Sequence, residues 1–176
     1  MKRRNITVVV FLLFIINLYL VGYSPWSSNE VKQYNLGYGV FDMKSYDSNI
    51  VYHVLDHMSP PGFDAYQKYL IIDNLFTVIF CILQVLLLTP AYRWSKSKLL
   101  HTIVLLTPII RMLCDLTENI SLNFILKAYP LRHDTLINFT SVMTKFKLKL
   151  VFLWVILMAI GYIMLFIKNR QLSEVK

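Results

Sequence analysis

The chain has 176 residues, a hydrophobic fraction of 56%, a mean hydropathy of +0.52 and a net charge of +8. This composition is too apolar for an ordinary water-soluble domain and is typical of a protein that folds in lipid. The basic residues stand mostly at the ends of apolar runs, which argues against nucleic-acid binding and favours contact with membrane headgroups. We therefore predict a single integral membrane domain over residues 1–176.

Four apolar segments are long enough to cross the hydrocarbon core of a bilayer, which takes roughly 20 helical residues. They cover residues 6–22, 70–92, 99–126 and 148–168. The start MKRR followed by an apolar run also fits a signal peptide, but the run is long and LVGYSPW is a poor cleavage site, so we predict an uncleaved first span. The predicted fold class is an all-α membrane protein with a four-transmembrane-helix bundle.

The basic amino terminus sets the expected orientation. Lys2, Arg3 and Arg4 precede the first span, and such residues stay in the cytoplasm. Four spans then leave both termini cytoplasmic. This preference of basic residues for the cytoplasmic side does not explain the lysines of the segment KFKLK, residues 145–149, which fall on the outer side.

The first outer loop, residues 23–69, is the only sizeable segment outside the spans. Its segment SYDSNIVYHVLDHM predicts a short amphipathic helix with Ser45 or Asp47 as N-cap. Aromatic residues prefer the headgroup region, so we expect this partly helical loop to lie on the membrane. The aromatic residues concerned are Tyr23, Trp26, Tyr34, Tyr38, Tyr46, Tyr52, Tyr66 and Tyr69.

Two histidines of the short helix raise the question of a metal site. His53 and His57 are four residues apart with Asp56 beside them, a spacing that can present two imidazoles to one ion. No further ligand or glutamate base accompanies them, so an exposed polar face is the favoured interpretation and neither a metal nor a cofactor is predicted. No nucleophile–base motif or phosphate loop is evident either, which lowers the expectation of an enzyme without excluding acid/base catalysis.

The stretch RMLCDLTENI, residues 111–120, puts ionisable side chains inside the third span. Arg111, Asp115 and Glu118 follow an i, i+4, i+7 spacing and so share one helical face, with Asn119 at its edge. A rise of ~1.5 Å per residue from the inner end places both acids in the outer leaflet.

The neighbouring helices can bring partners to the same depth. Asp73 and Asn74 fall in the first turns of the second span, while Lys145 and Lys149 precede or open the fourth. Of the two lysines, Lys145 is the better candidate to turn inward as a counter-ion. The predicted polar cluster therefore consists of Asp73, Asn74, Arg111, Asp115, Glu118, Asn119 and Lys145.

Two functions are consistent with such a cluster. A charge costs about 2.5–3.5 kcal/mol at the centre of a membrane helix, and pairing recovers part of this. The cluster is then either a structural latch that fixes helix register, or a pocket that binds a lipid or another hydrophobic small molecule or performs acid/base chemistry. An ion pathway is disfavoured because the inner halves of the spans carry few polar groups. Expected partners are membrane lipids, and the sequence does not define an oligomeric state.

Four segments of the chain form a recognisable set: FDMKSYDSNIVYHVLDHM, GFDAYQKYLIIDNLF, PIIRMLCDLTEN and SVMTK. In these segments the chain resembles an uncharacterised family of small four-span bacterial membrane proteins, and the likeness covers most of its length. The family pattern looks like a tyrosine before an aspartate in the second helix, here Tyr66 or Tyr69 with Asp73. In the third helix it looks like D-x-x-E-N, here Asp115, Glu118 and Asn119. A T-K pair enters the fourth helix, here Thr144 and Lys145. Where the family has a glycine–arginine pair before the tyrosine, this chain reads PPGFDAYQKY. The resemblance implies the same bundle in a bacterial cytoplasmic membrane, and no activity.

The segment DNLFTV is similar to one in the emopamil-binding-protein-like family, whose four-span bundles bind or isomerise sterols. That family looks to place a glutamate further down the same helix, where this chain has Gln84. The likeness therefore argues against sterol isomerisation. It implies only a small bundle that holds a hydrophobic ligand against a few acids.

Overall fold

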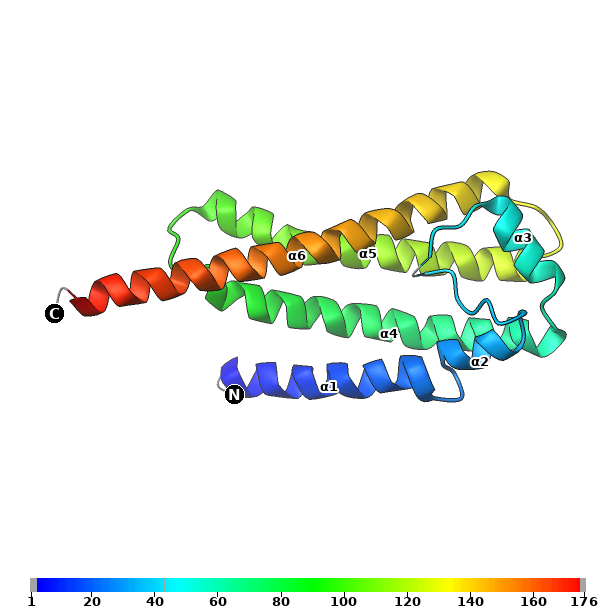
Figure 1. Ribbon diagram of the computed structural model, residues 1–176, viewed down its shortest axis with the longest axis horizontal. Coiled ribbons are helices and arrows are strands. Elements are labelled where there is room, and N and C mark those ends of the chain that lie inside the picture. Colours follow the sequence, from blue (N-terminus) through cyan, green and yellow to red (C-terminus); the bar gives the residue numbers. More distant parts are fainter. Residues whose placement is uncertain (1–2, 43, 175–176) are drawn as a thin grey trace.

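A computed structural model describes residues 3–42 and 44–174, and these residues form helices and no strand (Figure 1). The long helices are α1 (Arg3–Tyr23), α4 (Pro60–Ala91), α5 (Lys98–Ala128) and α6 (Asp134–Glu174), and the short ones are α2 (Ser28–Gln33) and α3 (Ser48–Asp56). The described chain contains four helical segments long and apolar enough to cross a membrane, so the predicted fold class is confirmed. The chain has the architecture of a multi-pass membrane protein.

All four long helices begin earlier than their predicted apolar spans, and α4 and α6 do so by several turns. α4 starts at Pro60 instead of residue 70. Proline suits the first turn of a helix, because the N–H groups there have no hydrogen-bond partner within the helix. α6 starts at Asp134 instead of residue 148. Hydropathy detects only the part of a helix that suits lipid, whereas the added turns pack against the first loop and the neighbouring helices.

The helices pack unequally. α5 lies against both α4 and α6, while α1 packs on α4 and on α2 (Figure 1). Phe14 of α1 meets the rings of Phe76 and Phe80 of α4, with centroids 5.5 and 5.2 Å apart. Much of the remaining α1 surface is exposed and apolar, as for Leu12 and Ile16. α1 is therefore the peripheral helix of the bundle.

The first loop covers one end of the bundle, which we call the loop end, and both termini lie at the opposite end (Figure 1). Asp47 caps α3 by accepting a hydrogen bond from the Ile50 N–H at 2.9 Å, which decides between the two predicted caps. Val51 and Leu55 of α3 belong to the same buried core as Leu122 and Ile125 of α5. The loop is thus partly helical, as predicted, and shares a hydrophobic core with the spans.

The aromatic residues of the loop end differ in exposure. Tyr23 and Trp26 are exposed and Tyr34 and Tyr38 are half-buried, whereas four tyrosines are at most 4% exposed: Tyr46, Tyr52, Tyr66 and Tyr69. The expectation of headgroup anchoring is wrong for the buried four, which form core under the loop instead. Composition alone does not separate buried from exposed aromatic residues, because a tyrosine suits either place.

At the opposite end, α4 and α6 meet in close contact around a glycine. A Cβ atom on Gly161 would lie 2.7 Å from Tyr92 Cε2 and 2.9 Å from Ala91 Cβ. The Tyr92 hydroxyl also donates to the Leu157 carbonyl at 2.8 Å. The absence of a side chain at Gly161 is what lets the two helices approach here.

We expect Gly161→Ala to lower the free energy of unfolding by about 1–3 kcal/mol, because the added methyl overpacks this contact. Gly22→Ala is the matched control, since nothing lies within 4 Å of the corresponding Cβ position, and it should be neutral or stabilising by up to about 1 kcal/mol. Unfolding of both variants by denaturant titration in the same mixed micelles measures the difference. Equal effects would show that the helices do not meet closely at Gly161.

Candidate functional site

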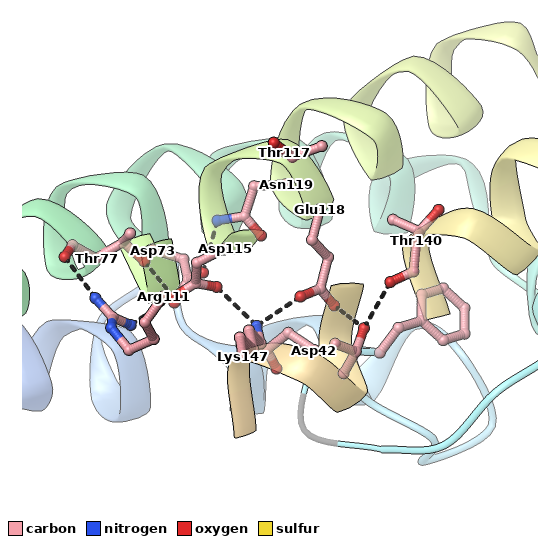
Figure 2. Close-up of polar contacts among 12 residues, drawn as sticks. Asp42, Asp73, Thr77, Arg111, Asp115, Thr117, Glu118, Asn119, Thr140 and Lys147 are labelled. Carbon is pink, nitrogen blue, oxygen red and sulfur yellow. Dashed lines mark hydrogen bonds and ion pairs between the residues drawn. The ribbon is translucent and has the colours of Figure 1, made fainter. Parts of the chain in front are cut away.

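A cluster of buried ionisable side chains lies near the loop end, where α4, α5, α6 and the first loop meet (Figure 2). Each of its residues is at most 7% exposed. We call it the buried charge cluster, and its members are Asp42, Asp73, Arg111, Asp115, Glu118 and Lys147.

Lys147 of α6 is at the centre of the cluster. Its Nζ lies 2.7 Å from Asp115 Oδ1 and 2.7 Å from Glu118 Oε2. The two acids are three residues apart on α5 and therefore lie on one face, so that a single ammonium reaches both (Figure 2). These ion pairs join α6 to α5.

Arg111 joins α5 to α4 in a similar way. Its guanidinium donates to Asp115 Oδ2 and to the Thr77 carbonyl, both at 2.9 Å. The Thr77 hydroxyl also donates to Asp115 Oδ2, at 2.7 Å, and the ring of Phe80 lies 4.8 Å from the guanidinium carbon. Arg111 and Asp115 thus lie on one helical face, as their spacing predicts, and form an ion pair across one turn.

Glu118 connects the cluster to the first loop. The Thr144 hydroxyl donates to Glu118 Oε1 at 2.6 Å, and the Tyr46 hydroxyl lies 3.1 Å from Thr144 Oγ1. Burial, and secondarily the charge of Glu118, raises the pKa of Tyr46, so this hydroxyl stays protonated. A loop residue thus takes part in the hydrogen bonding of a carboxylate inside the bundle.

Asp73 is held by neutral groups. The Asn119 side-chain amide donates to Asp73 Oδ2 at 2.7 Å and to Asn74 Oδ1 at 3.0 Å. In the described part of the chain, no basic side chain lies within ion-pairing distance of Asp73. The structure therefore brings together Asp73, Asn74 and Asn119, as the sequence predicts.

The prediction that Lys145 supplies the counter-ion is wrong. Lys145 and Lys149 are exposed, and the inward position belongs to Lys147. Because α6 begins well before its apolar span, its buried face is set by the 3.6-residue period of the earlier turns. Thr140, Thr144 and Lys147 lie on that face, and Lys145 points away from it. The sequence does contain a signal for Lys147, because Thr140, Thr144 and Lys147 follow an i, i+4, i+7 spacing and so share one helical face.

Asp42 is a cluster member that sequence reasoning missed, because it lies in an irregular part of the loop. Its Oδ2 accepts a hydrogen bond from the Tyr69 hydroxyl at 3.1 Å and lies 3.9 Å from Lys147 Nζ. The neighbouring Phe41 N–H donates to the Tyr66 hydroxyl at 2.8 Å, which fixes the backbone here. Burial, and secondarily the negative charge of Asp115, raises the pKa of Asp42.

The turn before Asp42 explains how an irregular segment can be so well placed. The side chain of Asn35, which is fully buried, accepts from the Gly39 N–H at 2.9 Å and donates to the Gly39 carbonyl at 2.7 Å. Gly37 and Gly39 have φ angles of +77° and +83°, which favour glycine. The closed turn helps to position Asp42, which is buried and lines the cavity described below.

A cavity of about 360 Å³ adjoins the buried charge cluster. Its polar lining comes from Asp42, Asp73, Arg111, Asp115 and Lys147, together with Ser28 and Tyr69. Its apolar walls come from α1, α4, α6 and the loop, and consist of Leu18, Val21, Val40, Phe76, Phe80, Leu148 and Val151. The lining of the cavity thus combines charged groups with apolar side chains.

The cluster therefore has two parts. Arg111, Asp115, Glu118 and Lys147 form a closed set of ion pairs between helices. Asp42 and Asp73 also line the cavity. Asp73 has no ion pair among the described residues, and Asp42 has only the longer one to Lys147, at 3.9 Å, while its Oδ1 is buried with no hydrogen-bond partner in the described structure. The first part explains helix packing, and the second part is the candidate binding site.

The histidines of α3 lie outside this site. His53 and His57 are exposed, their ring centroids are 4.6 Å apart, and His57 Nδ1 lies 2.8 Å from the His53 carbonyl oxygen. Among the residues described, no group of three or more His, Cys, Asp and Glu side chains is placed to hold a metal ion.

Comparisons with protein-family models, with curated proteins and with solved structures find no match to this chain. The argument for function therefore depends on the geometry of the buried charge cluster and its cavity.

We expect Lys147→Met to destabilise the protein by about 3–5 kcal/mol, because Asp115 and Glu118 would be left as buried charges without their ammonium. Lys145→Met is the matched control on the same helix and should change stability by no more than about 0.5 kcal/mol. Denaturant titration in mixed micelles compares the two free energies of unfolding. A larger loss of stability for Lys145→Met than for Lys147→Met would show that Lys145 is the counter-ion, as the sequence predicts.

We expect Asp42→Asn to remove a component of the pH dependence of stability. Because the folded-state pKa of Asp42 lies above its ordinary value of 3.8, the folded protein holds this proton more tightly than the unfolded chain, so stability falls as pH rises through that interval. The groups that act on this carboxyl are Tyr69, Lys147, Asp115 and Lys44. Unfolding of both proteins from pH 4 upward should show a steeper decline for the wild type, and parallel curves would contradict the assignment.

Proposed function

We propose that this membrane protein binds an amphiphilic small molecule, a lipid or a compound of similar build, in the cavity beside the buried charge cluster. The observation that carries the proposal is that one cavity of about 360 Å³ is lined both by apolar side chains and by carboxyl groups, of which Asp42 Oδ1 has no hydrogen-bond partner in the described structure. This volume lies within the usual range of small-molecule sites, which are mostly apolar with a few placed polar groups.

The packing of α1 supports entry from the lipid. Leu18 and Val21 of α1 and Val151 of α6 line the same cavity. Within the described chain α1 packs on α4 and α2, with no comparable packing on α6. An apolar chain can therefore leave the cavity between α1 and α6 while the head group stays against the carboxylates.

A structural role is the second candidate, and a specific contact favours it. Lys147 and Arg111 link α5 to both of its neighbours through Asp115. This set needs no ligand, because its charges are paired within the protein. The two roles are compatible because they concern different acids, with the closed set positioning the helices around the cavity.

We infer from the charges that the loop end faces outward and that both termini are cytoplasmic. Basic residues flank the spans at the end that carries the termini, as is usual for cytoplasmic flanks. Those in the described chain are Arg3, Arg4, Arg93, Lys96, Lys98, Lys168 and Arg170. The loop end also carries basic residues, but those of the long first loop count little toward orientation. A bacterial cytoplasmic membrane, with its lipids as the surrounding partners, is the setting that the family resemblance implies.

We expect the purified wild-type protein to carry a bound amphiphile that native mass spectrometry detects, and Val151→Trp to lose it, since the larger side chain fills the cavity. Val155→Trp is the matched control, because Val155 is on the same helix, does not line the cavity and is 49% exposed. It should keep the bound molecule. A wild type without any bound amphiphile, or equal occupancy in the two variants, would contradict the proposed function.

A further inference from the structure

We propose that the cavity takes a primary ammonium head group, bound between Asp42 and Asp73. The inference depends on the function proposed above and names the chemical class of its ligand. The favoured ligand is an amphiphile with one apolar chain and an amine that is protonated at neutral pH.

The first argument is the balance of charge. The buried charge cluster contains four carboxyl groups and two basic groups. Lys147 is already at 2.7 Å from Asp115 and Glu118 and only at 3.9 Å from Asp42, while Arg111 pairs with Asp115. Asp42 and Asp73 are therefore the surplus acids, and both line the cavity. In a region of low dielectric, a cation entering this cavity meets attraction that an anion does not.

The second argument is an unmet hydrogen bond. Asp42 is 7% exposed, and its Oδ1 has no hydrogen-bond donor in the described structure. A buried carboxylate oxygen without a donor is unfavourable, and a donor supplied by a ligand removes that penalty. A primary ammonium carries three N–H groups, whereas a quaternary ammonium carries none and a hydroxyl carries no charge.

The third argument is the aromatic wall beside Asp73. Phe76 and Phe80 follow Asp73 on α4 at i+3 and i+7, which places all three on one face, and all three line the cavity. Aromatic faces attract cations, as the position of Arg111 over Phe80 already shows. The face of α4 that the ligand meets thus combines a carboxylate with rings that tolerate a positive charge.

An anionic head group fits less well. The two basic side chains that line the cavity, Arg111 and Lys147, are both held by carboxylates. A fatty acid or a phosphate would need to take one of them from its partner. The same groups that close the helix contacts therefore bias the cavity against anions.

The test uses the full chain in phosphatidylcholine nanodiscs at pH 7 and four probes with the same decyl chain: decylamine, decyltrimethylammonium, decanol and decanoate. Native mass spectrometry and the shift of the unfolding temperature report binding. We expect decylamine to bind one to one, with at least tenfold higher affinity than any of the other three. Val151→Trp should abolish this binding, because the probe occupies the cavity.

Charge-removing variants locate the head group. Asp42→Asn and Asp73→Asn should each lower the affinity for decylamine at least tenfold and leave that for decanol unchanged. Asp64→Asn is the matched control, since Asp64 is exposed on the same helix as Asp73 and lies outside the cavity lining. It removes one negative charge from the protein and should leave decylamine binding unchanged. Two aspartates are tested separately, so the result stands if one variant fails to fold.

The outcomes separate this inference from the proposed function. Equal affinity for decylamine and decanol, or a preference for decanoate, overturns the inference that the ligand has an ammonium head group. Either result leaves in place the proposal that the cavity binds an amphiphile. Failure of all four probes, together with no bound amphiphile in the purified wild type, overturns both. Adding phosphatidylethanolamine to the nanodiscs identifies the source of the head group: displacement of decylamine indicates a phospholipid, and no displacement indicates a free long-chain amine.

Discussion

The contact of one ammonium with two carboxylates determines how this bundle is arranged. Lys147 reaches Asp115 and Glu118 at 2.7 Å each, inside a part of the protein where an unpaired charge would be strongly unfavourable. Any rotation or shift of α6 against α5 would separate these groups, so the pairs define the register of the two helices. Arg111 extends the same constraint to α4. Apolar packing alone defines register less sharply in lipid, where helix faces and solvent are equally apolar.

This constraint also creates the site. With α4, α5 and α6 held in register, the carboxylates of Asp73 and Asp42 are brought to the same cavity from a helix and from the first loop. The peripheral helix α1 completes the wall, and within the described chain it packs on α4 with no comparable packing on α6. In the function that we propose, stability and binding depend on different members of one cluster. The closely paired charges support the bundle, and Asp42 and Asp73, which have no basic group closer than 3.9 Å in the described chain, receive the ligand.

Hydropathy and helical period predict the four spans, the short helix α3 and the shared face of Arg111, Asp115 and Glu118, because each depends on local sequence. Lys147 was missed because the start of α6 was taken from hydropathy, although the preceding turns already define its buried face. Asp42 could not be predicted in this way, since its position depends on a turn closed by Asn35 and on hydrogen bonds to residues distant in sequence. The cavity depends on where α1 packs, which no local pattern specifies.

The central claim is that Lys147 is the counter-ion of the α5 acids, and a double-mutant cycle tests it most directly. Lys147→Met, Glu118→Gln and the double variant are unfolded by denaturant in the same mixed micelles, with Lys145→Met and Glu118→Gln as the control cycle. We expect a coupling of about 1–3 kcal/mol between Lys147 and Glu118, with the double variant less destabilised than the sum of the single ones. The control cycle should show none. Additive effects of Lys147→Met and Glu118→Gln would contradict the account.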